Sequence, residues 1–372
     1  MKRRRTHEST RLQMIPWCHL WPFLDDKSHV NLSLTSQNPV IRTLFVQSKR
    51  WQFPHVPLLA KKVSVPCCVT TNDMRKLPPT TKDVMFHSCG NYSCKPSELL
   101  IVPEGVVKFN SWSIDPDRQE FNQNREFRFP ASLTELNVSE DFDKPVILPP
   151  NLIRVTFGCM FNQELTLPSK LQSLRLKNNF DKPLTLPDSL TELYIGMRFN
   201  KPLELTSNLT LLHLEHCFNQ HLDLPLSLTD LQLSMNFDKP LKLPPNLTRL
   251  YLGVQFNEPV NIPLSMTDLT LSCQFNQPLD LPSNLTHLDI GNRFNQPLVL
   301  PNGLRRLQIG FDFNRPLILP ESLEGLWIRR CGGGYGFLEQ LCIPRGLQYF
   351  EADRVIRKNL THYFSHFYPG QF

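Results

Sequence analysis

The sequence lacks the features that would identify a membrane protein or a common type of enzyme. No stretch approaches the roughly 18 apolar residues of a membrane-spanning helix, so we expect no membrane partner. Neither Gly-x-Ser-x-Gly nor His-Glu-x-x-His occurs, and no pair of carboxylates recurs in a fixed frame. The glycine run at 332–334 lacks the Lys-Ser/Thr partner of a phosphate-binding loop. We therefore expect no catalytic residue and no cofactor.

Ten cysteines are present, but their spacing does not predict a metal site. A zinc site needs four ligands at reproducible spacing. Cys89 and Cys94 lack a convincing second pair, although Cys67, Cys68 and His87 precede them in the sequence. We expect no bound metal.

Charge is nearly balanced, with a net of +6 from 40 basic and 34 acidic residues, and we expect no nucleic-acid partner. Much of the excess lies in Lys2–Arg5. We expect residues 1–12 to form a basic, disordered tail, and a nuclear-import or phosphate-binding role is the alternative. The apolar segment Met14–Leu24 differs from a signal peptide, because Trp and Pro crowd it and no small-residue cleavage site follows. The expected location is intracellular, in the cytoplasm or the nucleus.

Proline and phenylalanine, in contrast, are abundant and periodic. Most of the 33 prolines fall at fixed points of a repeat, where they mark turns. A fixed period near 20 residues is typical of a solenoid, in which each repeat is one coil stacked on the last. The period is set by a Phe that is followed by Asn or Asp every 19 residues, at Phe142, Phe161, Phe180, Phe199, Phe218, Phe237, Phe256, Phe275, Phe294 and Phe313.

Each repeat contains two short apolar segments. In the unit 180–198 they are Leu184-x-Leu186 and Leu190-x-x-Leu193-x-Ile195, with Pro187 between them. Alternation at period two predicts two short strands with one buried face. The Asn or Asp after each Phe is expected to bond backbone groups and to bridge to the next coil. The sequence therefore predicts a β-solenoid of leucine-rich-repeat type, with short parallel strands and 19-residue coils.

The array extends beyond its regular part. We expect degenerate repeats over 53–120, regular repeats over 121–330 and a divergent C-terminal cap over 331–372. The proline and the strand pattern persist in three irregular segments, 77–86, 102–109 and 343–350. Because the 19-residue coil has no helical segment, we expect a rather flat solenoid and not a strongly bent horseshoe.

The Phe-Asn-x-Pro-Leu core, joined to Leu-Pro-x-Ser-Leu-Thr-x-Leu, resembles the FNIP repeat family of social amoebae and giant viruses of amoebae. The resemblance covers about 121–330. Where the family prefers Ile in the third position, this chain has residues such as Lys182 and Gln277, and the proline is replaced by Glu164 and His221. These departures leave the expected fold unchanged.

The segment 13–50 resembles an F-box, a small helical motif. The resemblance rests on Ile15-Pro16, Phe23-Leu24-Asp25-Asp26 and the end Leu32-Ser33-Leu34-Thr35, although Pro22 interrupts the expected helix. It implies docking on a Skp1-type adaptor, and through it on a cullin, with a helical cap over the first coil as the alternative. The apolar residues that would make this contact are Leu20, Phe23, Leu24, Val30, Leu32 and Leu34.

Varied side chains between the repeat leucines are candidates for binding a target protein. If the Leu-x-x-Leu-x-Leu strands line a concave face, these side chains point at a partner. Tyr, Trp and Arg are enriched in binding hot spots. The alternative is a solvated surface without a partner. The candidates are Arg175, Tyr194, His213, Tyr251, His287, Arg306 and Trp327.

Two functions are compatible with these features. The first is a non-catalytic substrate-recognition adaptor of a Skp1-cullin-F-box ubiquitin ligase, whose solenoid binds a target protein that the sequence does not identify. Catalysis would then belong to the assembly, which acts by proximity. The second is an FNIP-repeat interaction scaffold with no ubiquitin role. We expect no enzymatic activity of the chain itself under either hypothesis.

Overall fold

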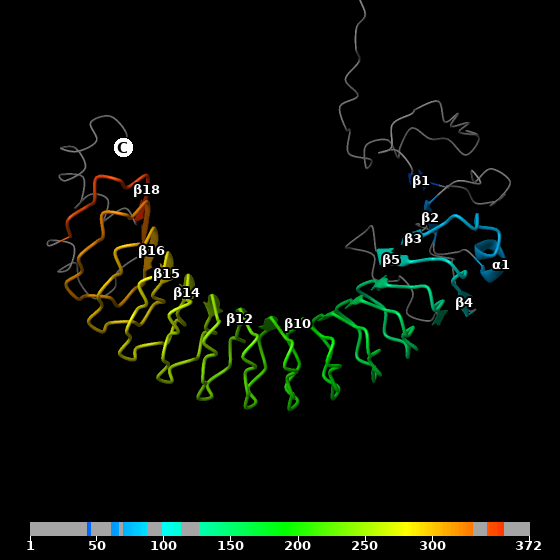
Figure 1. Ribbon diagram of the computed structural model, residues 1–372, viewed down its shortest axis with the longest axis horizontal. Coiled ribbons are helices and arrows are strands. Elements are labelled where there is room, and N and C mark those ends of the chain that lie inside the picture. The colour runs from blue at the N-terminus through cyan, green and yellow to red at the C-terminus, as the bar shows by residue number, and fades with distance from the viewer. Residues whose placement is uncertain are drawn as a thin grey trace, which may run out of the picture.

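The computed structural model describes residues 43–45, 61–66, 70–87, 99–112, 126–329 and 341–352. These residues wind into coils that stack along an arc, and each coil contributes a short strand to the inner side of the arc (Figure 1). Sixteen strands join in one sheet, and every neighbouring pair is parallel. The predicted β-solenoid with parallel strands is confirmed.

The sheet follows chain order from one end of the arc to the other. Its strands are β1 (Thr43–Phe45), β2 (Lys62–Pro66), β3 (Asp83–His87), β5 (Lys108–Trp112), β7 (Glu135–Asn137), β8 (Arg154–Phe157), β9 (Ser173–Leu176), β10 (Glu192–Ile195), β11 (Leu211–Leu214), β12 (Asp230–Gln232), β13 (Arg249–Tyr251), β14 (Asp268–Thr270), β15 (His287–Asp289), β16 (Arg306–Ile309), β17 (Gly325–Ile328) and β18 (Tyr349–Ala352). A separate parallel pair is formed by β4 (Leu100–Ile101) and β6 (Phe127–Arg128), and a short helix, α1, spans Thr71–Met74.

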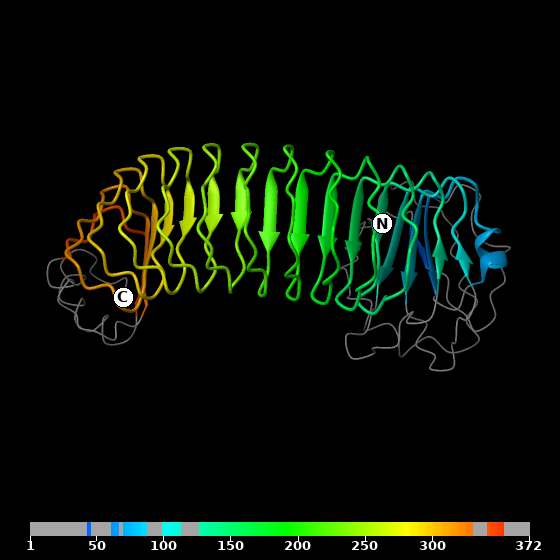
Figure 2. The ribbon, with the colours of Figure 1, turned by 90° about the horizontal axis from the view of Figure 1, so that it is seen from below.

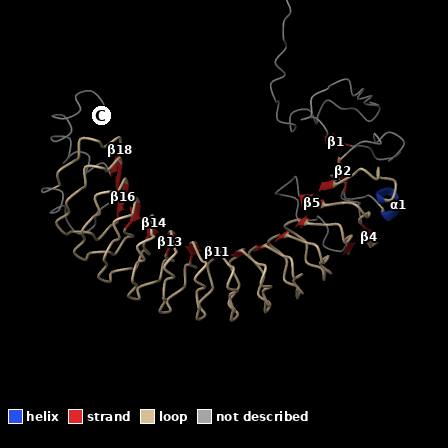
Figure 3. Cartoon of the chain, in the orientation of Figure 1, coloured by secondary structure: helices blue, strands red, loops and turns tan. Residues whose placement is uncertain are grey.

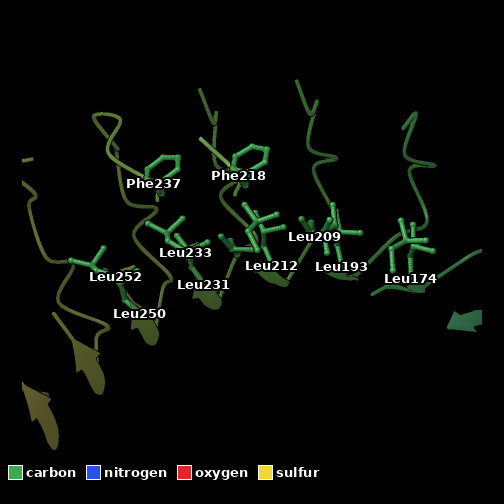
Figure 4. Close-up of a cluster of buried hydrophobic side chains, with 14 of the residues drawn as sticks. Leu174, Leu193, Leu209, Leu212, Phe218, Leu231, Leu233, Phe237, Leu250 and Leu252 are labelled. Atoms are coloured by element: carbon green, nitrogen blue, oxygen red, sulfur yellow. The ribbon is translucent and has the colours of Figure 1, made fainter. Parts of the chain in front are cut away.

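The core is a column of leucines backed by a column of phenylalanines. Leu193 and Leu212 are paired in register and are both fully buried. Phe218 and Phe237 lie on the side of the leucine cluster away from the strands (Figure 4). Each coil therefore has its apolar side chains between the strand and the outer loop. The apolar side chains of one coil pack against those of the next coil.

The phenylalanines form a continuous stack. All ten repeat rings, from Phe142 to Phe313, are at most 1% exposed. Consecutive ring centroids are 6.0–6.4 Å apart, and the ring planes differ by 2–16°. This offset stacking repeats at every coil and fixes the coil-to-coil distance at that depth of the core.

The expectation of a rather flat solenoid is wrong, because the coils form a strongly curved arc with the sheet on its concave side (Figure 1). Parallel strands lie about 4.8 Å apart, whereas the phenylalanine rings farther out lie 6.0–6.4 Å apart. Successive coils are therefore farther apart at the phenylalanine rings than at the sheet. This difference adds up from coil to coil and bends the array toward the sheet. A bulky ring supplies the width that a helix supplies in longer leucine-rich repeats.

The first apolar segment of the regular repeat is not a strand, which corrects the prediction of two strands per coil. Leu184 is buried and Leu186 is half-buried, but residues 182–188 form no ladder with the next coil. The segment lies in the outer loops, where the coils have diverged (Figure 3). The irregular coils differ, because β4 and β6 occupy the corresponding positions and do pair, Leu100 with Phe127.

The residue after each repeat phenylalanine forms the predicted bridge between coils. The side-chain oxygen of Asn162 accepts from the backbone N–H of Asp181 at 3.0 Å, and the Asp181 carboxylate accepts from the N–H of Asn200 at 3.3 Å. Eight such bonds of 2.8–3.3 Å run along the array. These residues satisfy backbone donors at the turn, which is the structural role expected of them.

Other polar positions bind the preceding coil in the same way. A threonine column donates its hydroxyls to carbonyl oxygens one coil back at 2.9–3.1 Å, as Thr210 does to Thr191. Asn208, Asn246 and Asn284 donate side-chain N–H groups to carbonyls of the preceding coil at 2.9–3.2 Å. Hydrogen bonds between successive coils therefore continue outside the ladder of the sheet.

The irregular coils at both ends join the same sheet. Phe86, Phe109 and Leu347 are buried, and Thr81 occupies an apolar position at 3% exposure. Thr43–Phe45 is a strand paired with β2, so the expectation of a helix across 13–50 is wrong at these three residues. The 19-residue offset between Thr43 and Lys62 explains this, since it is the period of the array. The rest of 13–50 lies outside the described residues.

Helix α1 was not predicted. Its N-cap, Thr70, accepts from the backbone N–H of Asp73 at 3.2 Å, and the Asp73 carboxylate accepts from the N–H of Thr70 at 3.1 Å. Burial raises the pKa of Asp73, but the bonds from Thr70 and the charge of Lys76 outweigh it, so the pKa lies below its usual value. The Thr-x-x-Asp spacing of this capping box was visible in the sequence.

Candidate interaction surface on the concave sheet

Two columns of side chains project from the sheet into the concavity. Along a strand, successive side chains point to opposite faces, and β10 and β11 show this as alternating half-buried and buried residues. The first column comprises Ser173, Glu192, Leu211, Asp230, Arg249, Asp268, His287, Arg306 and Gly325. The second comprises Arg175, Tyr194, His213, Gln232, Tyr251, Thr270, Asp289, Gln308 and Trp327.

The register of the parallel strands sets the order of the side chains along each column. Register pairs such as Tyr194 with His213, and Gln308 with Trp327, place same-column residues on adjacent strands. The strands run side by side across the middle of the arc (Figure 2). Leucines are almost constant at the buried positions of these strands, whereas the two columns hold acidic, basic, aromatic and amide side chains.

All seven predicted target-binding residues lie in these columns and are exposed or half-buried. They do not form one cluster. Arg175, Tyr194 and His213 lie on three consecutive strands, β9 to β11. Tyr251 stands apart on β13. The remaining three, which lie on the consecutive strands β15 to β17, are His287, Arg306 and Trp327.

The first group is a chain of contacts across five strands. The Arg175 guanidinium carbon lies 4.1 Å from the centroid of the Tyr194 ring, and that ring meets His213 edge-on with centroids 4.9 Å apart. His213 Nε2 lies 3.1 Å from Asp230 Oδ1, and Asp230 also pairs with Arg249. We call these five residues the Arg175 chain. Each side chain therefore contacts at least one other member of the chain.

Asp230 and Arg249 were not among the seven candidates, although they complete this group. The signal was the spacing of 17 residues between His213 and Asp230. The spacing is two residues shorter than the 19-residue period. A second-column residue therefore lies diagonally across from a first-column residue on the next strand, and long side chains can still meet at that distance.

The second group borders a shallow hollow of about 300 Å³ on the concave side of β14 to β17. Its rim includes His287, Arg306, Gln308 and Trp327. The Trp327 ring lies against Gly325, because a Cβ on that glycine would meet the Cη2 and Cζ3 atoms at 2.6 Å. Only a glycine in the first column leaves room for this indole to lie against its own strand.

Two carboxylates in the hollow are occupied by neighbouring donors. Asp268 lies 3.1 Å from His287 Nδ1 and accepts from the Thr267 hydroxyl at 2.6 Å. Asp289 accepts from the Gly291 N–H at 2.9 Å and from the Gln308 amide.

Burial sets the protonation behaviour of Asp289. Burial raises the pKa of this carboxyl, and the bond from Gly291, the charge of Arg329 and the bond from Gln308 only partly offset that effect. Arg329 Nη2 lies 3.5 Å from Asp289 Oδ2. Asp289 is therefore held by donors of its own chain, namely the Gly291 N–H, the Gln308 amide and the Arg329 guanidinium.

A third cluster lies at a turn edge of the solenoid. Glu140 accepts from the backbone N–H of Cys159 at 2.8 Å and pairs with Lys177. Burial raises the pKa of the Cys159 thiol to about 11, and the neighbouring carboxylate of Glu140 adds to the shift. Burial also acts to raise the pKa of Glu140, but hydrogen bonds from Cys159 and Lys177 outweigh it and bring the value below normal.

Other expectations meet the structure only in part. Among the described residues, no group of three or more His, Cys, Asp and Glu side chains is arranged to hold a metal ion. Within the same ranges, no helix has the length and hydropathy needed to cross a bilayer. The predicted Skp1-type contact residues lie outside the described residues, and so do Cys67, Cys68, Cys89 and Cys94.

The fold and this surface define a leucine-rich-repeat-like β-solenoid, a class whose members are typically non-catalytic binding scaffolds. The family described as FNIP Repeat matches residues 161–198, 237–274, 275–312 and 294–328. The chain therefore carries FNIP repeats in these segments. Protein–protein interaction is the activity that such a repeat solenoid suggests.

A solved structure supports the same class. The chain is similar to CroV588, a giant-virus protein described as a novel circular LRR protein, with 29% identity and a TM-score of 0.55. The match covers 76% of this chain and 45% of CroV588, so it spans less than half of that protein. YopM from Yersinia enterocolitica WA-314 matches at 18% identity and a TM-score of 0.42, over 76% of this chain and 74% of YopM. No curated protein sequence matches.

Proposed function

We propose that this protein is a non-catalytic recognition protein whose concave sheet binds a target protein. The observation that carries the proposal is the contrast between the two faces of each strand. The buried face repeats leucine from coil to coil, whereas the concave columns vary freely in charge and size over β9 to β17. A uniform scaffold that presents varied side chains in a fixed order is the arrangement by which solenoids bind extended surfaces.

A site-specific crosslinker tests this part of the proposal. A photoreactive phenylalanine replaces Tyr251, which is 44% exposed on the concave side, in one full-length variant. In the matched control it replaces Ile318, which is 89% exposed and lies outside the sheet, between β16 and β17. We expect irradiation of expressing cells to give discrete adducts from the Tyr251 variant only. The same adducts from both variants, or adducts from neither, would contradict concave-face binding.

We further propose that the protein is the substrate-recognition adaptor of a Skp1-cullin-F-box ubiquitin ligase and acts inside the cell. The support is the F-box-like sequence around Phe23-Leu24-Asp25-Asp26, followed in the same chain by a solenoid suited to binding. The solenoid would hold a target near the ubiquitin-charged enzyme, and proximity would raise the rate of transfer. An interaction scaffold with no ubiquitin role is the alternative.

Co-purification of the full-length chain with a Skp1-type adaptor distinguishes the ubiquitin-ligase adaptor from the scaffold with no ubiquitin role. We expect the wild-type chain to bind it, and Leu24→Asp and Leu32→Asp to abolish binding, because a carboxylate cannot be buried in an apolar contact without a large cost. The control Ile318→Asp is expected to bind normally, since that side chain is exposed and lies outside the strands. If the wild type fails to bind, or if all variants bind equally, the adaptor proposal is rejected and the scaffold remains.

A further inference from the structure

The hollow on the concave side of β14 to β17 combines a recess, an arginine without an acidic partner and an aromatic wall. Its rim residues come from both columns, and its volume of about 300 Å³ suits one or two side chains of a partner.

The aromatic wall is built by the pair Gly325 and Trp327. The two preceding members of the first column are His287 and Arg306, whose side chains extend from the sheet. Gly325 has no side chain, and the indole fills that space, with ring atoms 2.6 Å from where a Cβ would stand. The ring is half-buried. Because Arg306 pairs with Gly325 in the ladder, the indole lies beside Arg306.

The charge of Arg306 has no acidic partner in the described part of the chain. The two acids that line the hollow with it have other partners, Asp268 with His287 and Asp289 with Arg329. Its side chain is exposed at the rim.

The other concave arginines of β8 to β13 are each occupied. Arg249 pairs with Asp230, Arg154 lies 3.8 Å from Glu135, and Arg175 lies over Tyr194. Arg154 and Arg249 thus have acidic partners and Arg175 packs on a ring. Among the described residues, in contrast, the guanidinium of Arg306 has neither kind of contact and is available to a ligand.

We propose that this hollow binds an acidic side chain of the target protein, with a neighbouring apolar or aromatic residue of the target packed on Trp327. A guanidinium accommodates a carboxylate through two parallel N–H···O bonds, and this geometry selects a carboxylate over a neutral group. Trp and Arg are the side chains that most often dominate binding energy at interfaces. The inference rests on the proposed concave-face function and adds the chemistry of the residue that is recognised.

The test is selection from a phage-displayed library of random dodecapeptides on the full-length protein. We expect the selected peptides to share an Asp or Glu next to a Phe, Trp or Leu. A synthetic peptide of that sequence is expected to lose at least tenfold in affinity, by fluorescence anisotropy, on Arg306→Glu or Trp327→Ala. Repeating the selection on Arg306→Glu is expected to replace the acidic residue with Lys or Arg.

Arg249→Glu makes the same charge change within the first column, three strands away, and tests whether the peptide binds elsewhere on the concave sheet. The matched control is Arg198→Glu, which makes this charge change at an exposed residue outside the two columns. It is expected to leave peptide affinity within twofold. If affinity falls with Arg249→Glu and not with Arg306→Glu, the hollow is the wrong site, although concave binding stands. Selection of no peptide, or of peptides insensitive to every concave variant, contradicts both proposals. Arg306→Gln, with unchanged circular dichroism, separates loss of charge from loss of fold.

Discussion

The guanidinium of Arg175 lies over the ring of Tyr194, 4.1 Å from its centroid, although the two residues are 19 positions apart in the sequence. The register of the parallel strands β9 and β10 brings the two residues together, because both belong to the second column and are paired in the sheet. An exposed cation–π contact is worth about 0.5–1 kcal/mol. The contact therefore orders the concave surface more than it stabilises the fold.

A double-mutant cycle on Arg175→Ala and Tyr194→Ala measures that contact. We expect a coupling of about 0.5–1 kcal/mol in the free energy of unfolding in urea. The control cycle joins Arg175→Ala to Tyr251→Ala, which lies four strands from Arg175, and its coupling is expected to be near zero. Equal coupling in both cycles would mean that the contact is not formed in solution.

Removal of one ring from the phenylalanine stack is expected to be costly. Phe199 is fully buried between the rings of Phe180 and Phe218. We expect Phe199→Ala to lower the free energy of unfolding by about 3–5 kcal/mol, since it leaves a cavity in the middle of the array. Phe311 lies outside the stack and is 37% exposed, so Phe311→Ala is the control, with a much smaller loss. Comparable losses in the two variants would refute the structural role of the stack.

Successive coils approach closely at several glycines, and among the described residues the closest approach is at Gly310. A Cβ on Gly310 would lie 1.4 Å from the carbonyl oxygen of Gly291, so the coils would have to separate. We expect Gly310→Ala to reduce stability by about 1–3 kcal/mol, by urea denaturation followed with circular dichroism. At Gly303 the nearest atom is 3.6 Å away, and Gly303→Ala should change stability by at most about 0.5 kcal/mol. A tolerated Gly310→Ala would show that coil spacing adjusts freely.

The Cys159 thiol is expected to be unreactive near neutral pH. Its raised pKa, about 11, means that the folded state holds the proton more tightly, so the nucleophilic thiolate is scarce at about pH 8.5. Alkylation by iodoacetamide, followed by mass spectrometry of the Cys159 peptide, should accelerate as the pH rises toward 11. Any stability linked to this proton is present at neutral pH and is lost as the pH rises through that value.

Substitutions of the neighbouring charges should move this rate in opposite directions. Glu140 raises the pKa of Cys159 and Lys177 lowers it. Glu140→Gln is therefore expected to lower the thiol pKa and speed alkylation, whereas Lys177→Met slows it. The same direction of change in both variants would indicate altered exposure and not altered charge.

The sequence predicted the repeating part of this fold well, because one unit determines the rest. The Phe period, the buried leucines and the bridges formed by Asn162 and its equivalents all follow from the unit and its stacking. Curvature did not follow, since it depends on the difference between strand spacing and ring spacing, and a residue pattern contains neither distance. The strand predicted for the first apolar segment was wrong for the same reason, because Leu184 and Leu186 lie where the coils have already diverged.

The concave surface was predicted as a set of positions, not as contacts. Column membership of Arg175, Tyr194 and Trp327 follows from strand alternation. The diagonal contact of His213 with Asp230 depends on side-chain rotamers, and so does the placement of the Trp327 indole over Gly325. The Gly-Leu-Trp sequence at 325–327 was a usable signal for the latter, since the glycine and the indole share one face of a strand.

Because each strand of the sheet pairs only with the strands next to it, distances along the concave sheet come in whole steps. Arg175 on β9 and Arg306 on β16 are separated by seven strand intervals, or about 34 Å at a spacing of about 4.8 Å. Duplication or loss of one 19-residue unit between them would change this separation by a single step without altering either group. The number of repeats between the two groups therefore sets the distance between the two places where a partner can be bound.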